Sequence, residues 1–162
     1  MHRAYIGIGT NIEPRSMRMQ EAFGALRQFG IIEKKSSIYE TAPYGFTEQS
    51  DFLNAVVVLQ TQLELTNLHN TLRQLEKDLG RTNRPRWHER EIDFDILFYD
   101  DVAMNSKNLI VPHPELQNRS FVLVPMNEIA PDFIHPVFQK NIRKLLQELA
   151  FDKESIKPFI EI

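Results

Sequence analysis

Hydrophobic positions along the chain predict four strands. Runs of apolar residues mark buried strands at 4–9 and 51–61, and residues 34–41 also have strand character. At 92–99, apolar residues first alternate with acidic ones. Side chains alternate between the two faces of a strand, so this last pattern indicates one face on a core and one face at a polar site.

Four helices are predicted where apolar residues recur every three or four positions. These segments are 19–26, 68–79, 120–129 and 142–149. Thr66 is predicted as the N-cap of the second helix, and Gly80 as the residue that follows its end. Residues 151–162 show neither periodicity and are predicted to form a loosely held tail.

Two acidic side chains share one face of the strand at 92–99. Asp93 and Asp95 have Cα atoms roughly 6.5–7 Å apart in an extended strand, so both carboxylates can reach one hard cation or a pair of them. The same face is predicted to carry Leu97 and Tyr99. The core-facing set is predicted to be Ile92, Phe94, Ile96 and Phe98. Two acids on so hydrophobic a strand are costly unless a cation meets them.

The residues before this strand are rich in arginine. Residues 81–90 contain Arg81, Arg84, Arg86 and Arg90 against one acid, Glu89. Arginines beside a carboxylate pair suit a phosphate chain whose metal is held by the acids. The alternative is a solvated loop with an ordinary ion pair. These residues alone leave both interpretations open.

Three further features have a structural and a functional interpretation. Gly7 and Gly9 resemble part of a phosphate-binding loop, but no Lys-Ser/Thr continuation follows, and close backbone packing or a turn is favoured. Asn54 interrupts a hydrophobic strand. Its side-chain amide can form hydrogen bonds either to the edge of a bound heterocycle or to the backbone of a nearby loop. The residues alone favour the structural bond to the loop. The loop at 42–50 is long for a hairpin, which is typical of a functional loop.

Composition narrows the class of protein. The chain has 162 residues, 42% hydrophobic and 25% charged, and is predicted to form a single domain, 1–162. It has no cysteine, which favours magnesium over structural zinc. A net charge of −3 argues against nucleic-acid binding. No signal peptide or membrane-length apolar run is present, so we expect a cytoplasmic protein without a membrane partner. We also expect a monomer.

Several motifs together resemble the 6-hydroxymethyl-7,8-dihydropterin pyrophosphokinase family of folate biosynthesis. They are Gly-Thr-Asn at 9–11, Tyr-Glu-Thr-Ala-Pro at 39–43, Asp-Phe-Leu-Asn-Ala at 51–55, Arg-Trp-x-x-Arg-x-Ile-Asp-Phe-Asp-Ile-Leu at 86–97 and Val-Pro-His-Pro-x-x-x-x-Arg-x-Phe at 111–121. The resemblance implies an α+β, ferredoxin-like fold, with an antiparallel sheet and helices packed on one side. It also implies transfer of pyrophosphate from ATP to the pterin hydroxymethyl group, with release of AMP.

The resemblance also implies roles for single residues. Asp93 and Asp95 are expected to hold two Mg²⁺ ions that bridge the triphosphate of ATP, the co-substrate. The expected catalytic residues are Arg81, Arg90 and Asp95. The expected ATP-binding residues are Glu76, Arg81, Arg90, His113 and Arg119.

In the expected pterin site, polar groups bind the edge of the pterin ring and aromatic side chains stack on its faces. Its predicted residues are Thr41, Ala42, Tyr44, Phe52, Asn54, Asp93 and Phe121. Among these, Phe52 and Phe121 are expected to sandwich the pterin between their rings. Trp87 is expected to belong to a lid that closes over the site and excludes water.

Departures from the family pattern leave part of this open. Many relatives carry Gly-Pro where this chain has His88 and Glu89. After the histidine of the Pro-His motif, this chain has Pro114 in place of an aromatic residue found in relatives. Closure of the loop is therefore left open. The loop is also about one residue shorter than in relatives, so Arg84 and Arg86 stay unassigned. Two alternative functions are a magnesium-dependent phosphohydrolase and a catalytically silent pterin- or nucleotide-binding module. A phosphohydrolase of this kind would need further acidic metal ligands, which the motifs do not contain. A silent binding module would not need both Asp93 and Asp95, and this chain has both.

Overall fold

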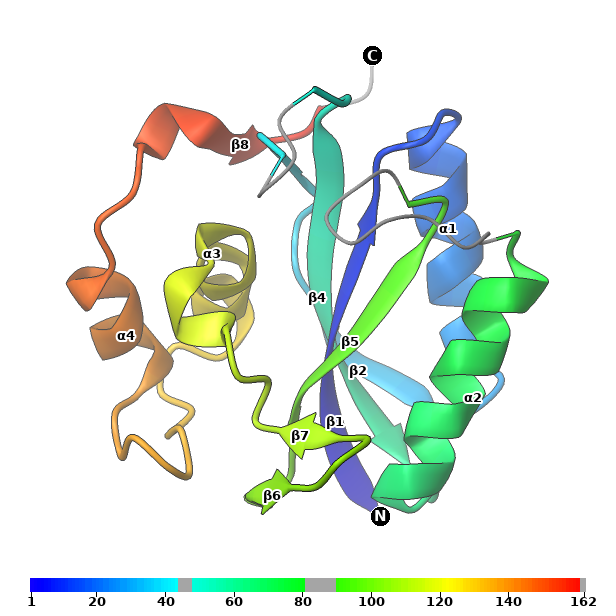
Figure 1. Ribbon diagram of the computed structural model, residues 1–162, viewed down its shortest axis with the longest axis vertical. Coiled ribbons are helices and arrows are strands. Elements are labelled where there is room, and N and C mark those ends of the chain that lie inside the picture. The colour runs from blue at the N-terminus through cyan, green and yellow to red at the C-terminus, as the bar shows by residue number, and fades with distance from the viewer. Residues whose placement is uncertain (44–47, 81–89, 161–162) are drawn as a thin grey trace.

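An antiparallel sheet forms the centre of the molecule (Figure 1). The computed structural model describes residues 1–43, 48–80 and 90–160. The strands of the sheet are β1 (His2–Thr10), β2 (Ile31–Lys35), β3 (Tyr39–Thr41), β4 (Phe52–Thr61), β5 (Asp93–Tyr99) and β8 (Ile156–Pro158). They lie in the order β5-β1-β4-β3-β8, and β2 also pairs with β4. The longest strands, β1 and β4, therefore lie inside the sheet, and β5 forms one edge.

Helices cover both faces of this sheet (Figure 1). On one face lie α1 (Arg15–Leu26) and α2 (Leu65–Asp78), and on the other lie α3 (Ser120–Ile129) and α4 (Ile142–Glu148). The order β1-α1-β2/β3-β4-α2-β5 is the ferredoxin-like order that the sequence predicts. Helices are expected on one side of the sheet, which holds for α1 and α2. The opposite face also carries apolar residues, and α3 and α4 bury them.

Alternation along the strands gives the sheet two distinct faces. On β1, Ile6 and Ile8 pack with α1 and α2, whereas Tyr5 packs with the cluster around α3. On β4, Val57 belongs to the first cluster and Val56 to the second. Two hydrophobic clusters, one on each side of the sheet, therefore hold the helices in place.

The strand β5 departs from the predicted alternation after Ile96. Its register against β1 shifts between the pairs made by Ile96 and Phe98, which leaves Leu97 as an extra residue. As a result Leu97 and Phe98 both join the cluster around α3, and Tyr99 joins the other cluster. The predicted faces of Phe98 and Tyr99 are therefore wrong, because a β-bulge inserts one residue into the alternation.

The strand predicted at 34–41 is split into β2 and β3. Both halves pair with β4, but Ser36 lies between them. The Ser36 hydroxyl accepts a hydrogen bond from the Val56 N–H at 2.9 Å, and the Ser36 N–H donates to the Val56 carbonyl at 2.9 Å. The Ser36 hydroxyl thus takes the place of a backbone carbonyl as the partner of the Val56 N–H, and the backbone pairing with β4 is interrupted here.

The predicted helices occur, with small differences at their ends. Residues 120–129 form α3 as predicted, with Pro125 inside it. Gly80 follows α2 with φ of 98°, a conformation that favours glycine. Thr66 is not the N-cap, because α2 begins at Leu65 and Glu64 occupies that position. No helix among the described residues combines the length and hydrophobicity needed to cross a bilayer.

The tail predicted to be loosely held instead completes the sheet. A 3-10 turn, η2 (Lys153–Ser155), leads into β8, which pairs with β3. Ile156 is 8% exposed, and the Ala42 N–H donates to the Ser155 carbonyl at 2.9 Å. A three-residue strand is too short to show periodicity, so the sequence pattern did not reveal it.

This pairing predicts a stability difference between two isoleucines of the same segment. Ile156→Ala should lower the free energy of unfolding by about 2 kcal/mol, because it removes a buried side chain at the β3–β8 pairing. The matched control Ile160→Ala, at a residue that is 80% exposed, should change it by less than about 0.5 kcal/mol. Urea unfolding of both variants measures the difference, and equal losses would contradict the packing of β8.

Candidate active site

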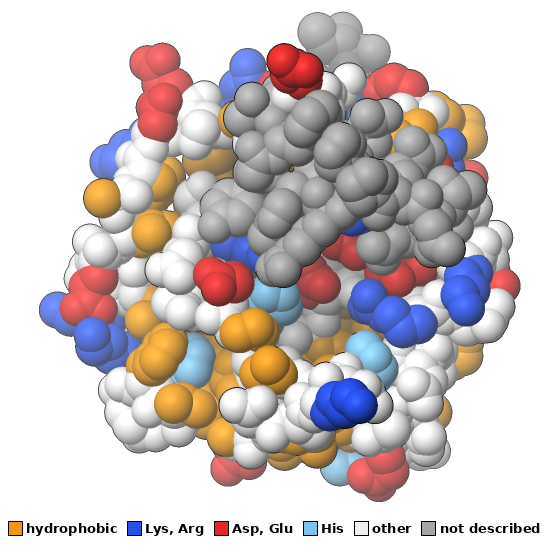
Figure 2. All heavy atoms as spheres, viewed as in Figure 1, with side chains coloured by type: hydrophobic (Ala, Val, Ile, Leu, Met, Phe, Trp, Pro, Cys, Tyr) orange, Lys and Arg blue, Asp and Glu red, His pale blue; other side chains and the backbone are white. Residues whose placement is uncertain are grey.

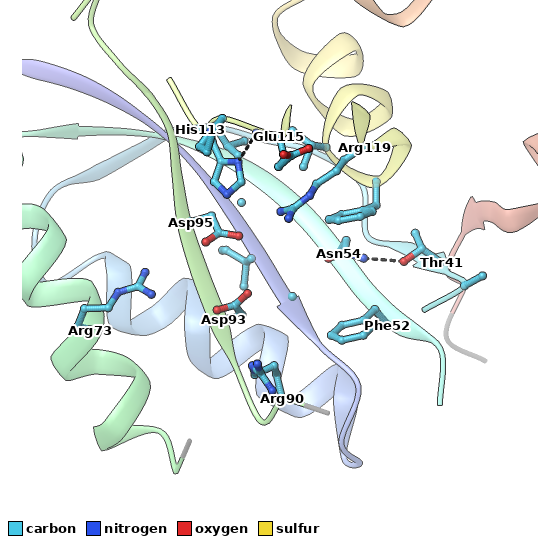
Figure 3. A pocket seen from close by; sticks show the side chains of 18 residues that line it. Thr41, Phe52, Asn54, Arg73, Arg90, Asp93, Asp95, His113, Glu115 and Arg119 are labelled. Atoms are coloured by element: carbon cyan, nitrogen blue, oxygen red, sulfur yellow. Dashed lines mark hydrogen bonds between the residues drawn. The ribbon is translucent and has the colours of Figure 1, made fainter. Parts of the chain in front are cut away.

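A cavity of about 360 Å³ opens on the face of the sheet that α3 covers. Figure 2 shows acidic, basic and histidine side chains gathered around a hollow near the centre of the view. Figure 3 shows the side chains that line it. The lining residues are Gly7, Ile8, Gly9, Thr41, Ala42, Phe52, Asn54, Arg73, Arg90, Asp93, Asp95, Leu97, His113, Pro114, Glu115, Arg119, Phe121 and Val122. The cavity is large enough for a small-molecule site.

Two glycines of β1 form the floor between β4 and β5. Gly7 pairs with Asp95 and Gly9 with Asp93 on β5, while Gly9 also pairs with Asn54 on β4. A Cβ atom at Gly9 would lie 2.7 Å from Oδ1 of Asn54. Close packing at Gly9, which the sequence favoured over a phosphate loop, is therefore confirmed, and the lack of side chains at Gly7 and Gly9 leaves space above this part of the sheet.

Asp93 and Asp95 both line this space from β5 (Figure 3). The bulge at Leu97 lies after them, so the predicted alternation holds over the residues that carry the carboxylates. The chain reverses after β5 through a short ribbon of β6 (Met104–Asn105) and β7 (Ile110–Val111) and then the 3-10 turn η1 (Leu116–Asn118). This return brings His113 and Arg119 to the cavity that the aspartates face.

Asn54 and Thr41 form a polar pair at the β3–β4 side. The Asn54 amide donates to the Thr41 hydroxyl at 2.7 Å, and both side chains are at least nine-tenths buried. Phe52 and Phe121 line the cavity beside this pair, and the Arg119 guanidinium lies 5.5 Å from the centre of the Phe121 ring. This side of the cavity therefore offers polar groups between aromatic rings. A structural bond and a binding role for Asn54 are both compatible with this geometry.

His113 is held as a neutral imidazole. Its Nδ1 accepts a hydrogen bond from the Glu115 N–H at 3.1 Å (Figure 3). Burial, with a smaller effect of the nearby Arg119 guanidinium, lowers the pKa of His113 to about 4, although Asp93 and Glu115 oppose this shift. Because Nδ1 is an acceptor, the ring proton sits on Nε2, and His113 can donate a hydrogen bond without carrying a charge.

Arg90 is positioned through its backbone by Asn11. The Asn11 side-chain oxygen accepts from the Arg90 N–H at 2.8 Å, and the Asn11 N–H donates to the Arg90 carbonyl at 3.1 Å. The same side chain donates to Gln49 Oε1 at 2.8 Å and to the Ser50 carbonyl at 3.0 Å. Asn11 thus fixes the residue from which the Arg90 side chain reaches the cavity, a function that its place in Gly-Thr-Asn did not reveal.

The family model described as 7,8-dihydro-6-hydroxymethylpterin-pyrophosphokinase (HPPK) matches residues 5–131. The chain belongs to the HPPK family. The 2-amino-4-hydroxy-6-hydroxymethyldihydropteridine pyrophosphokinase of Aquifex aeolicus is 38% identical over 159 residues, which cover 98% of this chain and 96% of the relative. The Bacillus subtilis protein of the same name is 41% identical over 128 residues, 78% of this chain and 77% of the relative.

Solved structures of the HPPK family share the fold. The crystal structure of wild-type Plasmodium falciparum HPPK-DHPS matches with a TM-score of 0.72 at 18% sequence identity. The match covers 91% of this chain and 43% of that chain, so this chain spans less than half the length of that protein. This likeness confirms the predicted α+β, ferredoxin-like fold.

The cavity brings together most of the site residues that the HPPK resemblance predicts. Thr41, Ala42, Phe52, Asn54, Arg90, Asp93, Asp95, His113, Arg119 and Phe121 all line it. Glu76 is not among the lining residues. Tyr44, Arg81 and Trp87 lie outside the described residues. The individual roles of these residues remain predictions.

Sequence reasoning missed several lining residues. Gly7 and Gly9 contribute by lacking side chains, and Glu115 contributes through the loop after β7. Arg73 lies one helical turn before Glu76 on α2, and the opposite charges of this pair at i and i+3 were the available signal.

The carboxylates of Asp93 and Asp95 suit a magnesium ion that is shared with a ligand. Within residues 1–43, 48–80 and 90–160, no group of three or more histidine, aspartate or glutamate side chains is placed to hold a metal ion. Mg²⁺ commonly binds one or two carboxylates and takes its other ligands from substrate phosphates and water. Two acids on one strand, beside the arginines Arg90 and Arg119, fit that arrangement.

The contact between Gly9 and Asn54 predicts different effects of two matched substitutions. Gly9→Ala should lower the free energy of unfolding by about 1–2 kcal/mol relative to Gly7→Ala, because the new Cβ displaces Asn54 from its bond to Thr41. A Cβ at Gly7 would meet the nearest atom of Leu97 at 3.6 Å, an ordinary contact. Urea unfolding compares the two variants. Equal stability would show that β1 or Asn54 shifts without cost.

Burial of neutral His113 predicts a dependence of stability on pH. The pKa rises from about 4 in the folded protein toward 6.5 on unfolding, so below pH 6.5 the unfolded chain binds more protons. The stabilisation is therefore complete above pH 6.5 and is lost as the pH falls toward 4. Between pH 7 and 5.5, the wild type should lose about 1 kcal/mol more than His113→Asn in urea unfolding. Parallel losses would contradict a neutral, buried His113.

Proposed function

We propose that this cavity is the active site in which the protein transfers pyrophosphate from ATP to 6-hydroxymethyl-7,8-dihydropterin, giving AMP and the pterin diphosphate. The observation that carries the proposal is that two carboxylates and a buried amide–hydroxyl pair flanked by aromatic rings face one cavity. A polyphosphate with its metal needs the first group, and a flat heterocycle with a polar edge needs the second. Membership of the HPPK family supports this assignment.

The pterin is proposed to bind on the β3–β4 side. Phe52 and Phe121 stack on the two faces of its ring, and such contacts contribute about 0.5–1.5 kcal/mol beyond burial. Asn54 and Thr41 bond the polar edge of the ring, together with backbone near Ala42. Because Asn54 is already held by Thr41, its amide is oriented before the pterin binds, which limits the entropy lost on binding.

ATP is proposed to place its triphosphate between Asp93, Asp95 and the cationic groups of the cavity. The two aspartates would hold two Mg²⁺ ions, which neutralise phosphate charge when bound. Arg90 and Arg119 donate charged hydrogen bonds to phosphate oxygens. His113 donates from Nε2 as a neutral group. These residues supply position and charge compensation, which is most of what transfer from a polyphosphate requires.

The proposed reaction is a single displacement. The hydroxymethyl oxygen of the pterin forms a bond to the β-phosphorus of ATP as the bond from that phosphorus to the oxygen shared with the α-phosphorus breaks. That oxygen leaves with AMP, and the hydroxyl proton passes to solvent. The protein forms no covalent intermediate in this scheme, so no side-chain nucleophile is required.

Substitution of one aspartate tests the proposal. Asp95→Ala should reduce kcat/KM by at least about a hundredfold, because the triphosphate loses the metal that compensates its charge. Asp101→Ala, an exposed acid in the turn after β5, is the matched control and should retain activity. The assay supplies ATP, Mg²⁺ and the reduced pterin and measures AMP and ADP separately.

The products distinguish the proposed reaction from its alternatives. AMP that appears only with the pterin supports pyrophosphate transfer, whereas ATP consumed without the pterin indicates a phosphohydrolase. Binding of both ligands without turnover indicates a silent binding module. Near-normal turnover by Asp95→Ala would refute the metal role of this residue.

A further inference from the structure

The free edge of β5 is occupied by two side chains of α2. Among the residues that the structure describes, β5 is the last strand of the sheet, so the backbone groups that point away from β1 have no neighbouring strand there. At Phe94 both of these groups are bonded to α2. The Phe94 N–H donates to Glu76 Oε2 at 2.8 Å, and the Arg73 guanidinium donates to the Phe94 carbonyl. Glu76 and Arg73 therefore take the place of a missing strand at this residue.

The two side chains also bind each other. Arg73 Nη1 lies 3.2 Å from Glu76 Oε1, at i and i+3 of the same helix. Each side chain therefore holds the other while it holds Phe94 (Figure 3 shows Arg73 reaching from α2 toward β5). Both partners sit on α2, which is anchored in the core by Leu68 and Leu72, each 0% exposed. The pair is thus a rigid connection between a helix and the edge strand.

The position of this connection matters because Phe94 separates the two aspartates. The Phe94 nitrogen belongs to the peptide unit that follows Asp93, and the Phe94 carbonyl belongs to the peptide unit that precedes Asp95. The two hydrogen bonds therefore fix the peptide planes from which both carboxylates diverge. The Phe94 ring is 0% exposed and faces the core, so it fixes the same residue from a third direction.

Stability alone gives little reason for a glutamate at this position. Glu76 is 3% exposed and follows Leu75 on the buried side of α2. A buried carboxylate has a large desolvation cost, and an apolar residue is often as stable or more stable at such a site. A carboxylate is useful here because it can accept from a backbone N–H and from an arginine at the same time.

We propose that Glu76 and Arg73 are positioning residues that orient Asp93 and Asp95 toward the same divalent ions. This proposal rests on the metal role proposed for the aspartates. In this proposal Glu76 binds the backbone of β5. The family resemblance instead implies that Glu76 contacts the nucleotide. Groups that orient metal ligands commonly change metal affinity or activity by about 10–100-fold when they are replaced.

Three variants of α2 separate the parts of this connection. Glu76→Leu removes the acceptor and the charge, Glu76→Gln keeps an acceptor oxygen for the Phe94 N–H, and Gln74→Leu alters an exposed residue of the same helix as the control. Binding of Mn²⁺ in the presence of a non-hydrolysable ATP analogue is followed by electron paramagnetic resonance. Glu76→Leu should weaken Mn²⁺ binding at least about tenfold, Glu76→Gln by less than about threefold, and Gln74→Leu not at all.

Steady-state kinetics distinguish positioning from direct contact with ATP. Positioning predicts that Glu76→Leu raises the Mg²⁺ concentration for half-maximal rate and lowers kcat, while KM for the pterin is unchanged. Direct contact predicts a higher KM for ATP at saturating Mg²⁺ in both Glu76 variants, with unchanged Mn²⁺ binding when the ATP analogue is saturating. That result would overturn the proposal.

Arg73→Met tests the same connection if Glu76→Leu does not fold. Loss of a positive charge near two carboxylates should by Coulomb's law strengthen Mn²⁺ binding. Loss of the bond to the Phe94 carbonyl should weaken it, by about 3–10-fold if Arg73 positions the strand. Stronger or unchanged binding would therefore refute the role of Arg73. Asp95→Ala, measured alongside, tests the metal site itself, because unchanged Mn²⁺ binding there would refute the metal role and not only the positioning.

Discussion

The pairing of β1 between β4 and β5 is the constraint on which the site depends. It places Gly7 opposite Asp95, and Gly9 opposite both Asp93 and Asn54. Because the two glycines have no side chains, the acids on one neighbouring strand and the amide on the other face an open space above the central strand. A shift of this register by one residue would turn the carboxylates into the core between the sheet and α2. The chemistry of the cavity is therefore specified by strand register.

The same face of the sheet serves two purposes along its length. At one end, Tyr5, Val58 and Phe98 pack against α3 and α4 as a hydrophobic cluster. At the other end, Gly9, Asn54 and Asp93 line the cavity. The change from an apolar to a polar surface occurs along the same three strands, β1, β4 and β5. The apolar half holds α3 in place, and α3 with the turn before it carries Phe121 and Arg119, so the packing at one end builds the wall of the cavity at the other.

Local periodicity predicted most of the fold but could not show where it is interrupted. The apolar stripes of α1 and α2 and the alternation at Asp93 and Asp95 have periods that a single sequence reveals. The bulge at Leu97, the split at Ser36 and the short strand β8 depend on contacts with residues distant in the chain, which leave no local period. In the cavity, the motifs identified side chains with evident chemistry. They did not reveal that Asn11 acts through the backbone of Arg90, or that the glycines line the cavity because they have no side chains.

The sheet edge at β5 explains why two acids can be presented by a strand at the border of the molecule. An edge strand has unpaired backbone groups on one side and would be expected to move more than an inner strand. Carboxylates that hold a metal ion, the role proposed for Asp93 and Asp95, need the opposite, since small displacements of their oxygens change coordination. Here β1 pairs with one side of β5, and Glu76 and Arg73 bind the other side at Phe94. Through these two bonds, α2 holds the backbone of the edge strand at Phe94, between the two acids.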